Sequence, residues 1–471
     1  MNPNLPPELP RVSVLRRRFL FFKLAGIGVL IALLHIPLGL TRGVLRERQN
    51  YRREAAREIT TTWGQNQTLI GPILAVPYAY RANVVRSKVV AGKVVQVEEA
   101  ELVSATAFFL PERLEVNGPV NAEQRHRGIY DVIVYSTKLQ LAGQFQPDFV
   151  AAGITADRID WEKAELLLGV SDLRGIRSVS PVTIAEGRTF AFESAEGAGR
   201  EGMDLSAKLS GVAAGQKLDF TLDATLQGSE RLDLVPVGKS TRVVLTSSWT
   251  EPSFGGASLP VKRSVGPSGF SAEWESAHFS RGFGQSWTTR TVENREMLKK
   301  FRASSFGVAF TEPVDAYRLA ERAQKYGVLF FVLVFSVFFL FEVTASLRIH
   351  PLQYAMVGGA LCLFFLGFLA LSEVWPPGRA YGVAAGACTA MVALYALSFL
   401  RTGWRTLIIA AGLGSTYGYL YFVLQSQDYA LLAGTAALFA TLALVMFCTR
   451  NINWYSLDAS HAGTGATKAT P

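Results

Sequence analysis

Three ionisable residues lie where they could do chemistry. Asp172 lies in the sequence Gly169-Val-Ser-Asp-Leu-Arg-Gly175, and a carboxylate beside an arginine in a glycine-bounded segment is a candidate catalytic acid or base. Glu342 lies inside an apolar stretch, where an ionisable side chain is a candidate functional group by default. His35 lies near one end of another apolar stretch.

Each candidate also has a structural interpretation. An aspartate in such a segment most often hydrogen-bonds its own backbone in a turn, and we expect this of Asp172. Glu342 lies toward the end of its stretch, about one and a half turns before Arg348, so it could reach the interface or pair with that arginine. His35 lies where water is close. The sequence therefore supplies candidates and assigns no catalytic residue.

Known catalytic and metal-binding motifs are absent from the sequence. His-Glu-x-x-His, Gly-x-Ser-x-Gly and a glycine-rich phosphate loop with a lysine do not occur. His126 and His278, the two histidines between the apolar ends, have no partner at metal-ligand spacing. We therefore expect no catalytic site, no metal and no cofactor, and we interpret the chain as non-enzymatic.

The net charge of +9 does not indicate nucleic-acid binding. Many of the basic residues cluster on both sides of the first apolar stretch, where such residues usually meet anionic lipid headgroups and set topology. No groove-reading motif accompanies the charge, so we exclude a nucleic-acid partner. Cys362, Cys388 and Cys448 all lie in apolar stretches, so the polar middle of the chain needs no disulfide.

Six apolar stretches are long enough to span a bilayer, since about 20 helical residues cross a hydrocarbon core of about 30 Å. They are residues 19–40, 326–347, 352–372, 380–400, 407–424 and 429–449. Lysine and arginine in short loops resist translocation and so set the orientation. Loops with Arg348, Arg401 and Arg405 alternate with loops that hold Glu373 or Asp428, which predicts cytoplasmic termini and a large domain outside.

The first stretch is predicted to remain attached as a signal anchor. The basic run from Arg16 to Leu20 resembles a twin-arginine export signal, but no small-residue cleavage site follows Leu40. Glutamates and arginines then alternate at helical spacing, which predicts a salt-bridged helical stalk. The predicted parts are a cytoplasmic leader, a transmembrane helix, the stalk, a periplasmic β-rich domain, a five-helix bundle and a cytoplasmic tail, at residues 1–18, 19–40, 41–62, 63–325, 326–449 and 450–471.

The polar middle of the chain has the alternation of β-strands. In residues 218–226 apolar side chains alternate with Asp and Thr, and residues 241–249 behave similarly. Residues 129–135 are almost continuously apolar, and residues 139–145 add another short strand. Short strands between glycine-rich turns predict mainly antiparallel sheets stacked as a sandwich, in one lobe or two. The predicted fold class is an α+β membrane protein, with one N-terminal and five C-terminal transmembrane helices flanking this periplasmic domain.

Two clusters of aromatic, proline and glycine residues stand out in the polar part. They are Trp249, Pro252 and Phe254 in the first, and Gly269, Phe270 and Trp274 in the second. Such clusters either pin a strand-to-loop corner in a core, which we favour, or form an exposed recognition surface. In the apolar part, the spacings Gly382–Gly386 and Gly414–Gly418 predict closely packed helices.

Taken in order along the chain, these residues resemble the CreD-type inner-membrane proteins, a family associated with cell-envelope integrity. The resemblance runs from about Phe19 to Tyr455. It rests on short motifs in both the polar and the apolar parts, namely Trp63-Gly64, Gly71-Pro72, Gly169 to Gly175 with Asp172, Trp249 with Pro252 and Phe254, Gly269-Phe270 with Trp274, Pro313, Asp315, Tyr317, His350-Pro351 and Asp428. We expect these motif residues to be mainly structural.

The resemblance implies a bacterial inner-membrane protein with a periplasmic domain, tied to envelope stress, colicin tolerance and the β-lactam response as the target of a two-component system. No reaction is established for such proteins, so the resemblance supplies no catalytic residue. We expect a protein that supports envelope integrity, with the lipid bilayer and a cell-wall or envelope protein as partners. A transporter or flippase of a lipid or cell-wall-related molecule, motivated by Glu342 and His35, is the alternative. An enzyme acting on cell-wall precursors, with Asp172 as its acid or base, is the third hypothesis.

Overall fold

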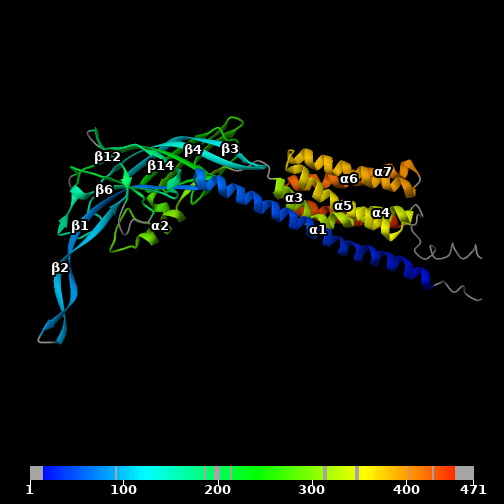
Figure 1. The fold of residues 1–471 in the computed structure, drawn as a ribbon, viewed down its shortest axis with the longest axis horizontal. Helices are drawn as coiled ribbons and strands as arrows, with labels where there is room; N and C mark the ends of the chain where they lie inside the picture. The colour runs from blue at the N-terminus through cyan, green and yellow to red at the C-terminus, as the bar shows by residue number, and fades with distance from the viewer. Residues whose placement is uncertain are drawn as a thin grey trace, which may run out of the picture. The chain divides into compact units, whose positions relative to one another are not determined.

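The structure is a computed structural model that describes residues 14–90, 93–184, 187–195, 202–212, 215–310, 316–344, 349–400, 402–426 and 429–450. The chain divides into two compact units. One is Arg52–Pro313, here called the β unit, and the other is Met1–Tyr51 with Val314–Pro471, here called the helical unit. The β unit contains two large sheets and the helical unit several apolar helices, so the fold is α+β as predicted (Figure 1).

The first sheet of the β unit has ten strands. They are β1 (Gln67–Val90), β2 (Lys93–Phe109), β5 (Arg158–Ile159), β6 (Glu165–Val170), β10 (Glu193–Ser194), β11 (Leu205–Lys208), β13 (Arg231–Leu234), β15 (Pro252–Gly256), β18 (Ser286–Thr288) and β19 (Phe306–Phe310). Their main order is β10-β11-β6-β1-β13-β19-β15, with β2 and β5 beside β1 and β18 beside β2.

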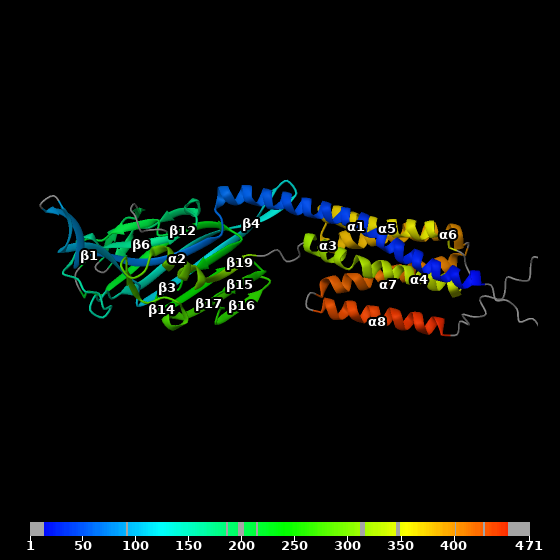
Figure 2. The same ribbon diagram turned by 90° about the horizontal axis from the view of Figure 1, so that it is seen from below.

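The second sheet has nine strands. They are β3 (Arg113–Arg127), β4 (Tyr130–Phe145), β7 (Ile176–Val179), β8 (Val182–Ile184), β9 (Arg188–Phe190), β12 (Leu218–Ser229), β14 (Ser240–Ser247), β16 (Lys262–Gly266) and β17 (Gly269–Ala277). Their main order is β16-β17-β14-β3-β4-β12-β8-β9, with β7 beside β12. Figure 2 labels the strands of this sheet from β16 to β12. The pairs β1–β13 and β14–β3 are parallel and the other strand pairs of the described chain are antiparallel, so both sheets are mainly antiparallel.

The two sheets face each other across one apolar core. The ring centroids of Trp274 and Phe306, from opposite sheets, lie 5.8 Å apart, and those of Tyr135 and Phe310 lie 5.3 Å apart. Helix α2 (Asn294–Ala303) adds Phe301 to the same cluster of buried residues. Because this cluster is continuous, the β unit is a single sandwich.

One predicted strand break does not exist. Residues 129–135 and 139–145 were expected to form two strands, but β4 runs through both. Three polar residues lie between them, and the middle one, Thr137, is only 2% exposed. Its hydroxyl donates to the Pro119 carbonyl over 2.8 Å, which satisfies the buried group and lets the strand continue.

β1 and β2 form a hairpin that continues beyond the rest of its sheet (Figure 1). Their register runs without a break to the pair of Val90 and Lys93. β5 pairs with β1 only as far as Ala79. Beyond that point the described strands give β1 no neighbour except β2. Residues 81–90 and 93–102 are called the β arm below.

The helical unit contains helices over all six predicted apolar stretches. They are α1 (Val14–Trp63), α4 (Gly327–Thr344), α5 (Pro351–Ser372), α6 (Pro377–Leu400), α7 (Gly403–Gln425) and α8 (Ala430–Thr449). By length and composition α1, α5, α6 and α7 could each cross a membrane. α3 (Ala316–Lys325) and α4 form a fifth candidate with a bend of 54°, and α8 contributes a shorter apolar segment, Leu432–Ala443.

Both unit boundaries differ from the predicted domain boundaries. α1 is one continuous helix, and the boundary falls inside it, between Tyr51 and Arg52. α3 belongs to the helical unit, because Ala320 and Ala323 are buried in the same apolar cluster as the long helices. The amphipathic sequence of α3 did not reveal this, since its other face is polar.

The two glycine pairs predicted to bring helices together are not used in that way. A Cβ atom at Gly382, Gly386, Gly414 or Gly418 would meet nothing within 4 Å. These glycines instead line a groove of about 630 Å³ between α6 and α7. Close helix approach occurs at Gly358 of α5, where a Cβ atom would lie 2.4 Å from a leucine side chain of α1.

Candidate functional site

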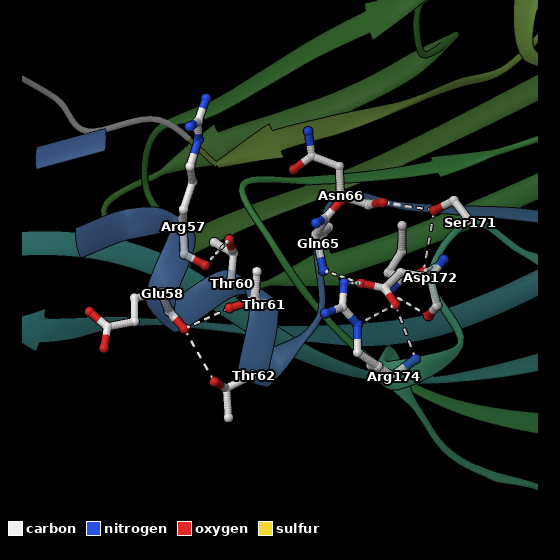
Figure 3. Close-up of polar contacts among 11 residues, drawn as sticks. Arg57, Glu58, Thr60, Thr61, Thr62, Gln65, Asn66, Ser171, Asp172 and Arg174 are labelled. Carbon is white, nitrogen blue, oxygen red and sulfur yellow. Dashed lines mark hydrogen bonds and ion pairs between the residues drawn. The ribbon is translucent and has the colours of Figure 1, made fainter. Parts of the chain in front are cut away.

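The start of β1 is tied to the segment that contains Asp172 (Figure 3). α1 ends at Trp63, and the φ of +120° at Gly64 turns the chain out of the helix in a conformation that favours glycine. In the following strand, the N–H of Thr68 donates to the Ser171 hydroxyl over 2.9 Å. We call Ser171–Gly175 the Asp172 turn.

Both carboxylate oxygens of Asp172 are occupied by donors of the chain (Figure 3). Oδ1 accepts the backbone N–H and the Nε of Arg174 over 3.1 and 2.9 Å. Oδ2 accepts Nη2 of Arg174 over 2.9 Å and the N–H of Gln65 over 3.1 Å. The Arg174 side chain holds the pKa of Asp172 below its ordinary value, against the opposing effect of burial. A general acid or base needs a pKa near the working pH, so this geometry is that of a turn aspartate.

Gln67 of β1 fastens the main chain of the Asp172 turn. Its side chain is buried, with Nε2 donating to the Asp172 carbonyl over 3.1 Å and Oε1 accepting the Asp172 N–H over 3.3 Å. Gly175 lies against this amide, and a Cβ atom there would be 2.1 Å from Gln67 Nε2 and 2.3 Å from the Gln227 carbonyl. The sequence did not predict this role of Gln67, because a single glutamine in a strand gives no local sign that it is buried.

Trp63 connects the end of α1 to the second sheet. Its Nε1 donates to the Tyr135 carbonyl of β4 over 3.4 Å, and the Arg125 guanidinium lies 4.8 Å from its ring centre. The Tyr135 hydroxyl donates to the Arg231 carbonyl over 2.8 Å, and burial raises the pKa of Tyr135 well above its ordinary value. The end of α1 is thus hydrogen-bonded to the second sheet, and Tyr135 of that sheet is in turn hydrogen-bonded to the first.

Glu342 is paired with a lysine from the other end of the sequence. The Lys23 ammonium of α1 forms an ion pair with the Glu342 carboxylate of α4, and the two side chains are 10% and 11% exposed. Lys23 Nζ also donates to the Ile349 carbonyl over 2.9 Å. Glu342 further accepts the Ile349 N–H over 3.3 Å and the Tyr354 hydroxyl over 3.0 Å. This Lys23–Glu342 cluster joins α1, α4 and α5, and Glu342 accepts from three donors of the chain.

His350 and Pro351 begin the helix that follows this cluster. His350 Nδ1 accepts the Leu352 N–H over 3.2 Å, and the Gln353 side chain accepts the His350 N–H over 2.9 Å. This reciprocal pattern is a capping box, and Pro351 occupies the first helical position, where its missing N–H costs nothing. The two motif residues therefore define the start of α5.

His35 is not part of the Lys23–Glu342 cluster. Its side chain is exposed, and its Nδ1 donates to the Ile31 carbonyl over 2.9 Å. Positions 23 and 35 of α1 are 12 residues apart, or about 18 Å at about 1.5 Å per residue. The structure therefore does not assemble the candidate residues into one site: Asp172 belongs to the β unit, and Glu342 and His35 are separated within the helical unit.

The aromatic motif residues lie in and around the core of the sandwich. Phe254 of β15 packs edge-on against Phe270 and Trp274 of β17, with ring centroids 5.5 and 5.6 Å apart. Trp274 is fully buried. Trp249 is partly exposed, and its Nε1 donates to the Glu251 carbonyl over 3.2 Å.

The remaining motif residues are at strand irregularities or outside the description. Gly71-Pro72 in β1 is a cis peptide bond. A Cβ atom at Gly169 would lie 2.0 Å from the Gly202 carbonyl, and Tyr317 of α3 has its hydroxyl 3.5 Å from the Glu373 carboxylate. Pro252 is the first residue of β15, and Gly269 is the first residue of β17. Three motif residues lie outside the described residues, namely Pro313, Asp315 and Asp428. Among the described residues, no group of three or more His, Cys, Asp or Glu could hold a metal ion.

Comparison with known proteins extends over nearly the whole chain. A family model described as Inner membrane protein CreD matches residues 19–455. The chain belongs to the CreD family. Inner membrane protein CreD of Escherichia coli (strain K12) is 34% identical over 440 residues, which cover 93% of this chain and 94% of that protein. Together with its apolar helices, this membership identifies a multi-pass inner-membrane protein.

Similarity to a solved structure adds nothing to the CreD assignment. A two-domain M1 zinc metallopeptidase mutant bound to L-tryptophan matches with a TM-score of 0.19 and 10% identity. The match covers 36% of this chain and 40% of the peptidase chain. At this score the match supports no inference about fold or chemistry.

Proposed function

We propose that this CreD-family protein supports cell-envelope integrity and the envelope stress response at the bacterial inner membrane without catalysing a reaction. In this proposal six helices cross the membrane and both termini are cytoplasmic. The β unit lies in the periplasm and binds a cell-wall or envelope partner, while the helical unit is held by the lipid bilayer. Neither a cofactor nor a nucleic acid takes part.

The observation that carries the proposal is the occupied carboxylate of Asp172. It is the best catalytic candidate of the β unit, and each of its oxygens already accepts two hydrogen bonds from the chain. A carboxylate held in this way shapes the fold and has no free oxygen for a substrate. Binding is therefore favoured over catalysis, and the apolar helices that precede and follow the β unit in the sequence support a role at the membrane surface.

The transporter or flippase alternative has less support. Its main candidate, Glu342, is already engaged by three partners, namely Lys23, the Ile349 N–H and the Tyr354 hydroxyl. A proton- or substrate-coupling carboxylate must exchange partners. The exposed His35 lies about 18 Å along α1 from Lys23, the ion-pair partner of Glu342. The groove between α6 and α7 is the one feature that favours lipid handling among those described.

Reporter fusions test the orientation. We expect a fluorescent protein fused to the C-terminus to fluoresce and alkaline phosphatase fused there to be inactive, because the phosphatase needs the periplasm to form its disulfides. Alkaline phosphatase inserted after Val150, which is 89% exposed, should be active. The opposite pattern at these two positions would reverse the proposed topology.

Replacing Asp172 by asparagine tests the non-enzymatic role. In a strain that lacks the protein, Asp172→Asn should restore resistance to envelope stress to at least about 80% of the original level, because asparagine keeps the shape and an acceptor for the Gln65 N–H. Immunoblotting must show equal protein levels, and Asp219→Asn, at an exposed position of β12, is the matched control. Loss of rescue by Asp172→Asn alone, at a normal protein level, would favour catalysis.

A further inference from the structure

The outer face of the second sheet carries a groove that crosses four strands. Its floor is a cross-strand row in which Pro119 of β3 pairs with Thr246 of β14, Thr246 with Ser271 of β17, and Ser271 with Ser264 of β16. These strands lie next to one another (Figure 2), and at about 4.8 Å per strand the row is roughly 14 Å long. All four side chains are exposed.

Two adjoining hollows lie over this row. Their volumes are about 420 and 390 Å³, and both are lined by Pro119 and Thr246. We call the two hollows together the Thr246 groove. Each volume lies within the range of about 300–1,000 Å³ that is typical of small-ligand sites. The groove exists because the residues of its floor have small side chains.

Neutral polar residues are the commonest type in the lining of the Thr246 groove, and charged residues are almost absent from it. Beyond the floor it includes Asn117, Asn121, Gln140 and Ser248. Lys138 is the one charged residue in the lining of these two hollows, and its ammonium is already paired with an aspartate of β12 over 2.9 Å. The groove therefore offers hydroxyl and amide groups, and no carboxylate.

These side chains keep their hydrogen-bonding capacity free. Within the described part of the chain, the side chains of Asn121, Thr246, Ser264 and Ser271 have no hydrogen-bond partner. The neighbouring row of the same face is different, because Glu273 pairs there with an arginine over 2.7 Å and with a lysine over 3.3 Å. Free neutral groups thus line the two hollows, whereas the charged side chains of Glu273 and its neighbours are already paired.

We infer that the Thr246 groove binds a neutral sugar chain. Hydroxyl and amide side chains both donate and accept, which matches the hydroxyl and N-acetyl groups of such a ligand. A phosphate or carboxylate would require an unpaired cation, and the groove has none among the described residues. The flat, apolar ring of Pro119 can support the C–H face of a sugar ring. The inference names the ligand class for the proposed periplasmic binding role and rests on it.

An extended peptide fits the Thr246 groove less well. Peptides usually bind a sheet by adding a strand to its edge, where main-chain N–H and C=O groups are free. The floor from Pro119 to Ser264 instead runs across the strands, whose main-chain groups already pair with one another. The groove therefore presents side-chain groups, as recognition of a sugar chain requires.

Calorimetric titration of the full-length protein in phospholipid nanodiscs, which avoid sugar-headed detergents, tests this inference. The probe is the tetramer of N-acetylglucosamine. We expect saturable binding by the original protein and at least a tenfold loss of affinity in Thr246→Arg, because the arginine fills the floor. Ser271→Ala should weaken binding about three- to tenfold, since it removes one neutral hydrogen bond. Thr221→Arg, at an exposed position of β12 on the same face outside the groove, should bind as the original does.

Absence of tetramer binding by the folded original protein would overturn the inference, and so would equal binding by Thr246→Arg. Circular dichroism must show that each variant is folded. Binding of a neutral glycine–serine peptide without sugar binding, lost in Thr246→Arg, would identify a peptide site and would also overturn it. Rescue of envelope-stress resistance distinguishes sugar binding from its proposed role in envelope integrity. If Thr246→Arg does not bind the tetramer but still rescues fully, the sugar site is supported and its proposed role in envelope integrity is contradicted.

Discussion

Lys23→Met is expected to lower the free energy of unfolding of the helical unit by about 3–5 kcal/mol, because it leaves the buried Glu342 carboxylate without its counter-ion. The two remaining donors to Glu342, the Ile349 N–H and the Tyr354 hydroxyl, are neutral and cannot balance its charge. Labelling of Cys362 and Cys388 during denaturation measures the effect. Both thiols are buried, and the β unit contains no cysteine, so in a Cys448→Ser background labelling reports on the helical unit alone.

The double variant Lys23→Met/Glu342→Gln is the control for this prediction. It removes both charges, so it should recover most of the lost stability. We also expect it to restore envelope-stress resistance, since the role we propose for the cluster is to hold three helices together. A stable but inactive double variant would instead support the transporter hypothesis. An unchanged labelling midpoint in Lys23→Met would show that the pair is not structural.

Gly175→Ala is expected to destabilise the β unit by about 3 kcal/mol or more. The added methyl group would lie 2.1 Å from the Gln67 side chain and 2.3 Å from the Gln227 main-chain carbonyl, and the carbonyl cannot rotate away. The Asp172 turn would have to separate from β1. Urea denaturation followed by tryptophan fluorescence measures this, because Trp63 lies at the same junction.

Gly282→Ala provides the matched control in the same unit. A Cβ atom at Gly282 would meet nothing within 4 Å, and its φ is not in the positive range. The free energy of unfolding of this variant should therefore agree with that of the original protein to within about 0.5 kcal/mol. If both glycine variants unfold at the same urea concentration, the close packing at Gly175 does not contribute to stability.

The elements that depend on local pattern could be predicted from the sequence. The strict alternation in residues 218–226 predicted a strand there, and β12 (Leu218–Ser229) occupies it. The apolar stretches likewise coincide with helices, because helix length and hydropathy are both local properties. The break expected within β4 was wrong. The pattern treats Thr137 as an exposed residue, but its hydroxyl is buried and donates to the Pro119 carbonyl.

The partners of the candidate residues could not be predicted in the same way. Lys23 and Glu342 are 319 positions apart, and Gln67 and Asp172 are 105 apart. Periodicity carries no information about such distant contacts, nor about the parallel pairing of β14 with β3. One signal was available for the ion pair: residues 19–40 and 326–347 each hold one Lys, Arg, Asp or Glu, and the predicted topology places these two opposite charges, Lys23 and Glu342, toward the same side. The Asp172 turn, in contrast, follows from local residues, because Arg174 is only two positions away.

The length of the β arm does not depend on the core of the sandwich. Its register with the body is set where β1 and β2 join the sandwich, and the ladder from there to Val90 and Lys93 has no bulge. Residue pairs added or removed at the tip would change the reach of the ribbon by about 3.4 Å per pair and would leave every buried contact in place. Related chains can therefore differ widely in arm length at no cost to the sandwich, as long as insertions and deletions come in matched numbers on the two strands.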